Sequence, residues 1–185
     1  MTSPVWQNGL RLAGRYQVRK LEGVGPLGDR YLALDVQSGL DVVLRALDRA
    51  LCPDEAALAA FRERTSRARA LSHPGLIRIH DVVRHAGREA TVVERVSGRT
   101  AAAALLADGP LPWSAASAAL HQVGAAVRCA HQAGLVLGDL RPTTVVLTDG
   151  GPRVVTVGVA RRRALNTAND APLYQDIALG RDGDE

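Results

Sequence analysis

The fold is decided by residues 134–161, which read Gly-Leu-Val-Leu-Gly-Asp-Leu-Arg-Pro-Thr-Thr-Val-Val-Leu (134–147) and, after a turn, Arg-Val-Val-Thr-Val-Gly-Val-Ala-Arg (153–161). Two short apolar runs, Thr144–Leu147 and Arg153–Val155, flank the turn Asp149–Pro152. Runs of β-branched residues on either side of a Gly/Pro turn predict a β-hairpin. A loop that carries one carboxylate, Asp139, therefore leads into a short hairpin.

Upstream of this stretch the pattern changes from strands to helices. Alternating or continuous apolar runs predict strands, and a 3-and-4 spacing of apolar residues predicts helices. The expected strands lie near 16–21, 30–35, 41–48, 76–83 and 89–96, and the expected helices start near 54, 101 and 114. Five strands and one helix before a mostly helical second half indicate an α+β fold with two segregated parts.

The three expected helices begin at residues suited to cap them. Asp54, Thr100 and Ser114 are candidate N-caps, because their side-chain oxygens can accept a bond from a free N–H of the first turn. The buried sides are predicted from the spacing: Leu58, Phe61, Thr65, Ala68 and Leu71 in the first helix, and Leu120, Val123, Val127 and Ala130 in the last.

Residues 134–161 resemble the catalytic loop and metal loop of a bacterial Ser/Thr protein kinase. Such a kinase reads Gly-Ile-Val-His-Arg-Asp-Val-Lys-Pro-x-Asn-Ile-Leu and then Asp-Phe-Gly, and this chain keeps Asp139, Pro142 and Gly158. The resemblance places Asp139 at the catalytic-base position. Thr144 and Thr156 replace the two metal ligands, so the resemblance implies that no metal site remains.

A glycine-rich segment between the first two expected strands resembles the kinase phosphate-binding loop. Gly23, Gly25 and Gly28 form the pattern Gly-x-Gly-x-x-Gly, which alone is weak evidence because such turns often only join two strands. Pro26 removes one backbone donor from the loop. Arg30 stands where a kinase usually places a Val against adenine, so the phosphate grip is expected to be impaired.

Two further positions carry the resemblance into the nucleotide site. Arg45 stands where a kinase has the Lys that holds the nucleotide phosphates, and Arg64 stands where the helix Glu would pair with that Lys. Glu63 lies about 100° round the helix and should face elsewhere. Val93 and Glu94 fall at the gatekeeper and hinge positions, so a degenerate nucleotide cleft is expected there.

The resemblance covers nearly the whole chain and sets the expected domain organisation. It implies an N-terminal arm (1–14), a kinase-like N-lobe of five antiparallel strands and one helix (15–96), a partial and mainly helical C-lobe (97–180) and an acidic tail (181–185). Within the C-lobe, Gln175–Gly180 resembles the start of a large helix. A complete kinase fold is longer, which predicts a truncated domain or a fragment of a larger reading frame.

These features predict a pseudokinase that acts as a regulatory or scaffolding protein-binding module, with no cofactor. The alternative is a divergent Ser/Thr kinase or ATP-binding protein with weak, metal-independent phosphoryl transfer. Asp139 would then be the base, whereas in the first hypothesis it is a retained structural carboxylate. Four defects, at Arg30, Arg45, Thr144 and Thr156, favour the first hypothesis.

Composition limits the possible partners and compartments. The net charge is +4, but the arginines are scattered and aromatic residues make up only 3% of the chain, which disfavours nucleic-acid binding. No apolar run is long enough to span a bilayer, and the N-terminus has no signal-peptide core. Cys52 and Cys129 are isolated, which fits a reducing cytoplasm. The resemblance suggests a forkhead-associated domain or a cell-wall regulatory protein as the protein partner, with Thr167 as the candidate phosphoacceptor.

Overall fold

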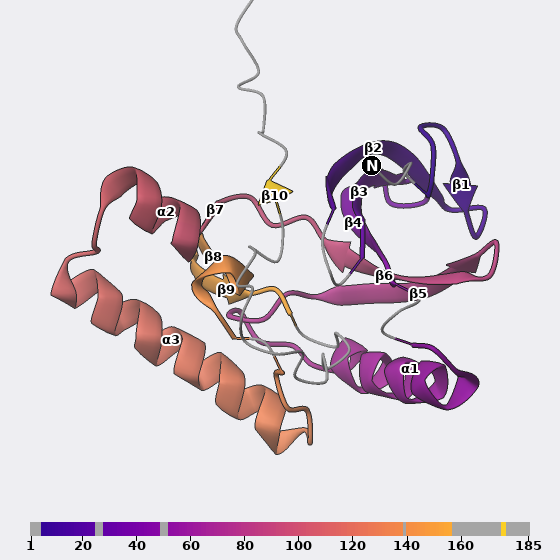
Figure 1. Cartoon of the computed structure of the whole chain (residues 1–185). Coiled ribbons are helices and arrows are strands. Elements are labelled where there is room, and N and C mark those ends of the chain that lie inside the picture. The colour runs from indigo at the N-terminus through magenta and orange to yellow at the C-terminus, as the bar shows by residue number, and fades with distance from the viewer. Residues whose placement is uncertain (1–4, 25–27, 49–51, 139, 157–174, 177–185) are drawn as a thin grey trace, which may run out of the picture.

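The computed structural model describes residues 5–24, 28–48, 52–138, 140–156 and 175–176. A twisted antiparallel sheet with one helix forms the first part, and two helices with a small second sheet form the second part (Figure 1). This arrangement agrees with the predicted α+β order of the elements.

The large sheet has the strand order β1-β2-β3-β4-β6-β5, and β10 pairs with the other end of β2, on the edge that β3 leaves free. Its strands are β1 (Arg11–Leu12), β2 (Tyr16–Val24), β3 (Arg30–Asp35), β4 (Asp41–Ala46), β5 (Ile79–His85), β6 (Arg88–Glu94) and β10 (Gln175–Asp176). The small sheet comprises β7 (Arg99–Thr100), β8 (Val145–Thr148) and β9 (Gly151–Val154). The helices are α1 (Glu55–Arg69), α2 (Ala101–Asp108) and α3 (Trp113–Gln132), with a 3₁₀ turn at Pro142–Thr144.

The prediction of a five-stranded sheet was wrong, because β1 and β10 extend it. β1 forms because Ala13 and Gly14 adopt positive φ angles of 49° and 67°, which turn the chain so that Leu12 pairs with Tyr16. Trp6 is buried in the same core. Residues 5–12 are therefore packed against the sheet, whereas the sequence had suggested an irregular arm.

β10 replaces the predicted start of a large-lobe helix. Gln175 pairs with Val24 and Asp176 with Gly23 in an antiparallel register. The outer edge of β2 beyond β1 offers backbone groups that another strand can satisfy. Local sequence similarity to a helix start gave no sign of this tertiary pairing.

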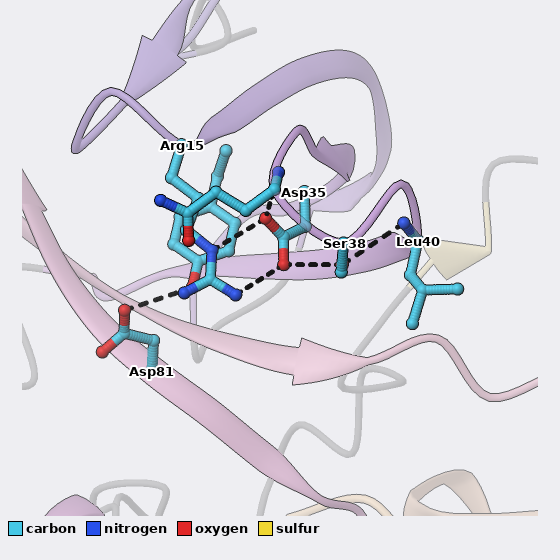
Figure 2. A network of polar contacts seen from close by, with 7 residues as sticks. Arg15, Asp35, Ser38, Leu40 and Asp81 are labelled. Atoms are coloured by element: carbon cyan, nitrogen blue, oxygen red, sulfur yellow. Dashed lines mark hydrogen bonds and ion pairs between the residues drawn. The ribbon is translucent and has the colours of Figure 1, made fainter.

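A polar network fixes the ribbon formed by β2 and β3 (Figure 2). Arg15 donates from Nε and Nη2 to the two oxygens of Asp35, both at 2.7 Å, and the Ser38 hydroxyl donates to Asp35 at 2.8 Å. These bonds, led by that of Arg15, hold the pKa of Asp35 well below its usual range. Tyr16 donates its hydroxyl to Asp81 at 3.1 Å, and burial raises the pKa of Tyr16 to about 12. The network ties β2 to the β3–β4 turn and to β5.

Helix α1 forms as the sequence predicted. The Asp54 side chain accepts from the Ala57 N–H at 2.7 Å, which confirms the N-cap. Phe61, Thr65 and Ala68 are the buried residues of the helix, and they lie on the predicted stripe. The amphipathic spacing alone was sufficient to orient this helix.

Helix α3 differs from its prediction in two ways. It begins at Trp113 after Pro112, which occupies the cap position, so Ser114 lies inside the first turn and does not cap. Leu120 is 67% exposed, and the buried residues are Val123, Ala126 and Ala130. The buried face is therefore rotated away from Leu120 toward small residues. None of the described helices, α3 included, has the length and apolar character needed to cross a membrane.

The two parts share one hydrophobic core. Ile77 donates its N–H to the Val154 carbonyl at 3.0 Å, and Val154 donates to the Gly75 carbonyl at 2.8 Å. One cluster of buried side chains includes Val43 and Val93 from the large sheet, Ala68 from α1, Ala126 and Ala130 from α3, and Val154 from β9. A site between the two parts is therefore held by a continuous packed interior.

Candidate functional site

A cavity of about 340 Å³ lies where the large sheet faces β7 and β8. This volume falls within the ~300–1,000 Å³ range of small-molecule pockets. Apolar side chains from both parts line it: Val43, Ile77, Val93, Val146 and Val155. Val93, the predicted gatekeeper, is fully buried among them. The cavity is where the sequence predicted a nucleotide cleft.

Two arginines, Arg30 of β3 and Arg45 of β4, occupy the sheet side of this cavity. They are direct cross-strand partners, and both line the cavity. Arg45 donates from Nη1 to the carbonyl of Val155. The Arg30 guanidinium lies over Gly23, where an added Cβ would stand 2.8 Å from Arg30 Nη2. The pairing places two guanidinium groups next to each other on the sheet side of the cavity, which Glu22 and Glu94 also line.

Gly28 has a structural role that accounts for its presence. Its φ is +115°, and an added Cβ would lie 1.7 Å from the carbonyl oxygen of Ala46. The backbone of the glycine-rich segment therefore rests directly on β4, and any side chain at this position would prevent the contact. At Gly23 an added Cβ would meet only the flexible end of the Arg30 side chain, so this glycine is less constrained than Gly28. Gly25 lies outside the described residues.

Glu94, predicted to lie at the hinge of the cleft, uses its carboxylate to join the two parts. Glu94 Oε1 accepts from the Arg78 N–H at 2.7 Å and also from Arg153 Nη2. Arg153, on β9, donates in addition to the Leu76 carbonyl at 3.2 Å. Sequence reasoning missed Arg153, because no local spacing relates β6 to β9.

Thr144, the first predicted replacement of a metal ligand, is completely buried. Its hydroxyl donates to the Arg141 carbonyl at 3.0 Å and accepts from the Arg141 N–H at 2.9 Å. Its own carbonyl accepts from the Val155 N–H at 3.0 Å. Thr144 therefore closes the 3₁₀ turn and connects it to β9.

Thr156, the second predicted replacement, is also buried, at 4% exposure. Asp139, the predicted base, lies outside the described residues. Within the part of the chain that the structure describes, no group of three or more His, Cys, Asp or Glu side chains is placed to hold a metal ion.

The acidic residue of α1 nearest the predicted ion-pair position is directed away from the cavity. Glu63 is exposed and pairs with Arg67 one turn along the helix. Arg64, at the predicted ion-pair position, is half-buried. Arg62 pairs instead with the buried Glu89 at 2.6 Å. α1 thus uses its acidic side chains for local surface pairs.

Comparison with known proteins shows what this chain is similar to. The chain is 31% identical over 159 residues to the serine/threonine-protein kinase PknA of Mycobacterium tuberculosis, a match that covers 83% of this chain and 37% of PknA. It is 29% identical over 153 residues to PrkC of Bacillus subtilis, covering 82% of this chain and 24% of PrkC. The solved kinase domain of M. tuberculosis PknI superposes with a TM-score of 0.77 at 27% identity.

The chain has a bacterial Ser/Thr protein kinase-like fold. It spans well under half the length of PknA and PrkC, and 62% of the PknI kinase domain. No protein-family model matches it. In this kinase-like fold the large sheet with α1 corresponds to the N-lobe, and the cavity lies between the lobes.

The loop before Asp139 also departs from the kinase pattern. Leu137 and Gly138 stand where kinases have His and Arg. Leu137 packs against the core cluster that joins the two lobes. An apolar residue at this position adds to the shared interior of the kinase-like fold.

Proposed function

We propose that this chain is a catalytically degenerate kinase-like domain, a pseudokinase, that serves as a regulatory or scaffolding protein-binding module. The observation that carries the proposal is the hydrogen bonding of Thr144. Mg²⁺ prefers hard oxygen ligands in octahedral geometry, usually one or two carboxylates together with phosphates and water. A threonine hydroxyl can ligate Mg²⁺ in other nucleotide sites. At Thr144, however, the hydroxyl donates to and accepts from the Arg141 backbone, and the side chain is completely buried, so its remaining lone pair is not presented to solvent.

Thr156, at the second metal position, also supports a loss of metal binding. Thr156 is neutral and buried, so it brings no charge to the place where a carboxylate would bind the ion. Phosphoryl transfer depends on metal ions that neutralise charge developing on the phosphates. Replacing both ligands by hydroxyls should therefore reduce catalysis severely.

The sheet side of the cleft also departs from the kinase pattern. Arg45 donates to Val155 and thereby reaches across to the segment before Thr156. Arginine is a rigid planar fork, whereas lysine is a compact charge on a flexible stem, so the exchange alters the geometry offered to phosphates. Arg30 further narrows the cleft above Gly23.

Calorimetric titration of ATP with and without Mg²⁺ tests the proposal. We expect Mg²⁺ to change the affinity by less than about twofold, that is by less than about 0.5 kcal/mol. The double variant Thr144→Asn/Thr156→Asp, with both family ligands restored, is the matched gain-of-binding control. A metal enhancement of about tenfold or more in the natural chain would contradict the proposal.

A specific observation favours a second candidate, an ATP-binding protein with slow, metal-independent phosphoryl transfer. Arg30 and Arg45 are adjacent at the cavity and could neutralise phosphates in the absence of metal. This candidate predicts micromolar ATP binding without Mg²⁺ that is lost in both Arg30→Ala and Arg45→Ala. It also predicts transfer of labelled phosphate that is lost in Asp139→Asn.

We propose a cytoplasmic protein partner, with a forkhead-associated domain or a cell-wall regulatory protein as the candidates suggested by the kinase resemblance. Thr167, the proposed phosphoacceptor, lies outside the described residues. A pull-down with the phosphorylated chain and its Thr167→Ala variant distinguishes recognition of phosphothreonine from recognition of the folded domain.

A further inference from the structure

Arg45 joins the large sheet to the strand end that leads to Thr156. It lies on β4 between Leu44 and Ala46, which are both completely buried, so its backbone is fixed within the sheet. Its Nη1 group donates to the carbonyl of Val155, a residue of the second part that is 110 positions away in the sequence. The guanidinium group therefore connects the two parts at the cavity that both residues line.

The carbonyl that Arg45 binds belongs to a segment whose backbone is bonded on both sides. The Val155 N–H donates to the Thr144 carbonyl at 3.0 Å, and the Val154 N–H donates to the Gly75 carbonyl at 2.8 Å. Val155 is thus bonded through its N–H to the 3₁₀ turn and through its carbonyl to the large sheet. The Arg45 side chain is what attaches this strand end to β4.

A phosphate in the cavity would have to compete with Val155 for Arg45. Arginine presents its donors in one rigid plane, so the direction of Nη1 also fixes the directions of the other N–H groups. A hydrogen bond with a charged donor contributes more to stability than one between neutral groups. Turning the guanidinium group toward a phosphate breaks such a bond, and the loss subtracts from the affinity for any phosphorylated ligand.

The other charges at the cavity do not compensate for this loss. The Glu22 carboxylate lines the cavity and repels a second anion. Two further arginines that line the cavity bind carboxylates: Arg95 pairs with Asp41 at 3.4 Å, and Arg99 pairs with Asp108. The apolar part of the lining, which includes Val43 and Val93, is not altered by the Arg45 contact.

We propose that Arg45 is a latch that holds the strand end at Val155 to the large sheet and keeps its guanidinium group from binding phosphates. The cleft therefore prefers a flat, uncharged ligand, for which adenosine is the probe, to the phosphorylated form of that ligand. The inference rests on the proposed function, because it names the part of a nucleotide that the degenerate cleft no longer recognises. It goes beyond the loss of metal ligands, since the latch acts without metal.

Calorimetric titration of adenosine and of ATP in the presence of EDTA tests the ligand preference. In the natural chain we expect ATP to bind no more tightly than adenosine. In Arg45→Lys the affinity ratio should shift toward ATP by about tenfold or more, because the lysine ammonium keeps the charge but ends one bond short of Nη1 and no longer holds Val155. The affinity for adenosine should change by less than about twofold in this variant.

Hydrogen exchange measures the latch itself. Arg45→Met keeps a long side chain without donors and should speed exchange of the Val154 and Val155 amides by about tenfold or more. Arg30→Met is the matched control, since it removes the same charge from the neighbouring strand and leaves the Val155 contact in place. It should change these rates by less than about twofold. Unchanged exchange in α1 and β5 in both variants shows that the sheet part remains folded.

Four results would overturn the inference. The first is ATP binding about tenfold or more tighter than adenosine binding in the natural chain without metal, which would favour the second candidate function. The second is an unchanged affinity ratio in Arg45→Lys, the third is equal exchange of Val154 and Val155 in Arg45→Met and the natural chain, and the fourth is no adenosine binding at millimolar concentration. A metal effect on ATP affinity would contradict the proposed function alone, because these measurements contain no metal.

Discussion

The two lobes bury very different kinds of side chains. The large sheet encloses big residues such as Tyr16, Tyr31 and Leu44, all at 1% exposure or less. The second part contributes small residues from α3, Ala126 and Ala130 among them, and exposes the larger Trp113 and Leu120. Apolar burial stabilises a fold roughly in proportion to the area removed from water. The sheet therefore buries the largest side chains of the described core.

The cavity and the exposed apolar side chains of α3 lie in different places with respect to this packing. The cavity lies at the junction of the two parts and is held by the shared core, so its geometry depends on the sheet. The exposed Trp113 and Leu120 of α3 lie on the second part.

The sharpest way to test this comparison is to truncate one leucine in each part. Leu44→Ala removes a fully buried side chain from the sheet, which should lower the free energy of unfolding by about 2–5 kcal/mol. Leu120→Ala removes an exposed one and should change it by less than about 0.5 kcal/mol. Urea denaturation followed by circular dichroism measures both. Equal losses would mean that Leu120 contributes as much to the folded state as the buried Leu44.

A smaller effect is expected where the two parts join. Arg153→Ala leaves Glu94 without its cross-lobe partner, and we expect a loss of about 1–3 kcal/mol because both side chains are partly buried. The double-mutant cycle with Glu94→Gln isolates the coupling between the two groups. Hydrogen exchange should show faster opening of β8 and β9 than of β3 and β4. An additive cycle would show that Glu94 and Arg153 are not coupled and that the shared apolar core alone joins the lobes.

The sequence predicted well those elements that local chemistry determines. α1 was correctly capped and oriented, since Asp54 and the stripe through Phe61 and Ala68 lie within one helix. β1 and β10 were missed because their pairing depends on contacts formed by the folded sheet, and Ala13 gives no sign in the sequence of its positive φ. The error in α3 arose because a 3-and-4 pattern of apolar residues does not say which side faces the core when small residues do the packing.

The candidate site was predicted in position but not in its interactions. The kinase resemblance located Arg45, Val93 and Glu94, and the structure brings all three to the cavity. It did not indicate that Arg30 and Arg45 are cross-strand partners or that Glu94 binds Arg153. Both facts depend on strand register and on contacts across the chain, which one sequence without related sequences does not reveal.

Acidification should affect the stability of the two parts differently, because the Arg15–Asp35 network lies only in the sheet part. The folded-state pKa of Asp35 is below the unfolded value of about 3.9. Its contribution to stability is therefore fully present above about pH 5 and is lost as the pH falls through 4 toward the folded pKa, because the unfolded chain takes up the proton first.

The variant Asp35→Asn should remove much of this acid dependence and lower stability at pH 7, whereas Asp41→Asn, which breaks exposed ion pairs, should alter neither by much. Urea unfolding between pH 7 and pH 3, with hydrogen exchange resolved by segment, measures the effect. β2 and β3 should lose protection before the buried side of α3. At high pH a second effect comes from Tyr16. Its pKa is raised to about 12 in the folded protein, so the phenol of the unfolded chain ionises first and the stability of the fold decreases between pH 10 and 12. Loss of protection in α3 ahead of β2 on acidification would show that the sheet is not held by this network and would remove the electrostatic part of the contrast between the lobes.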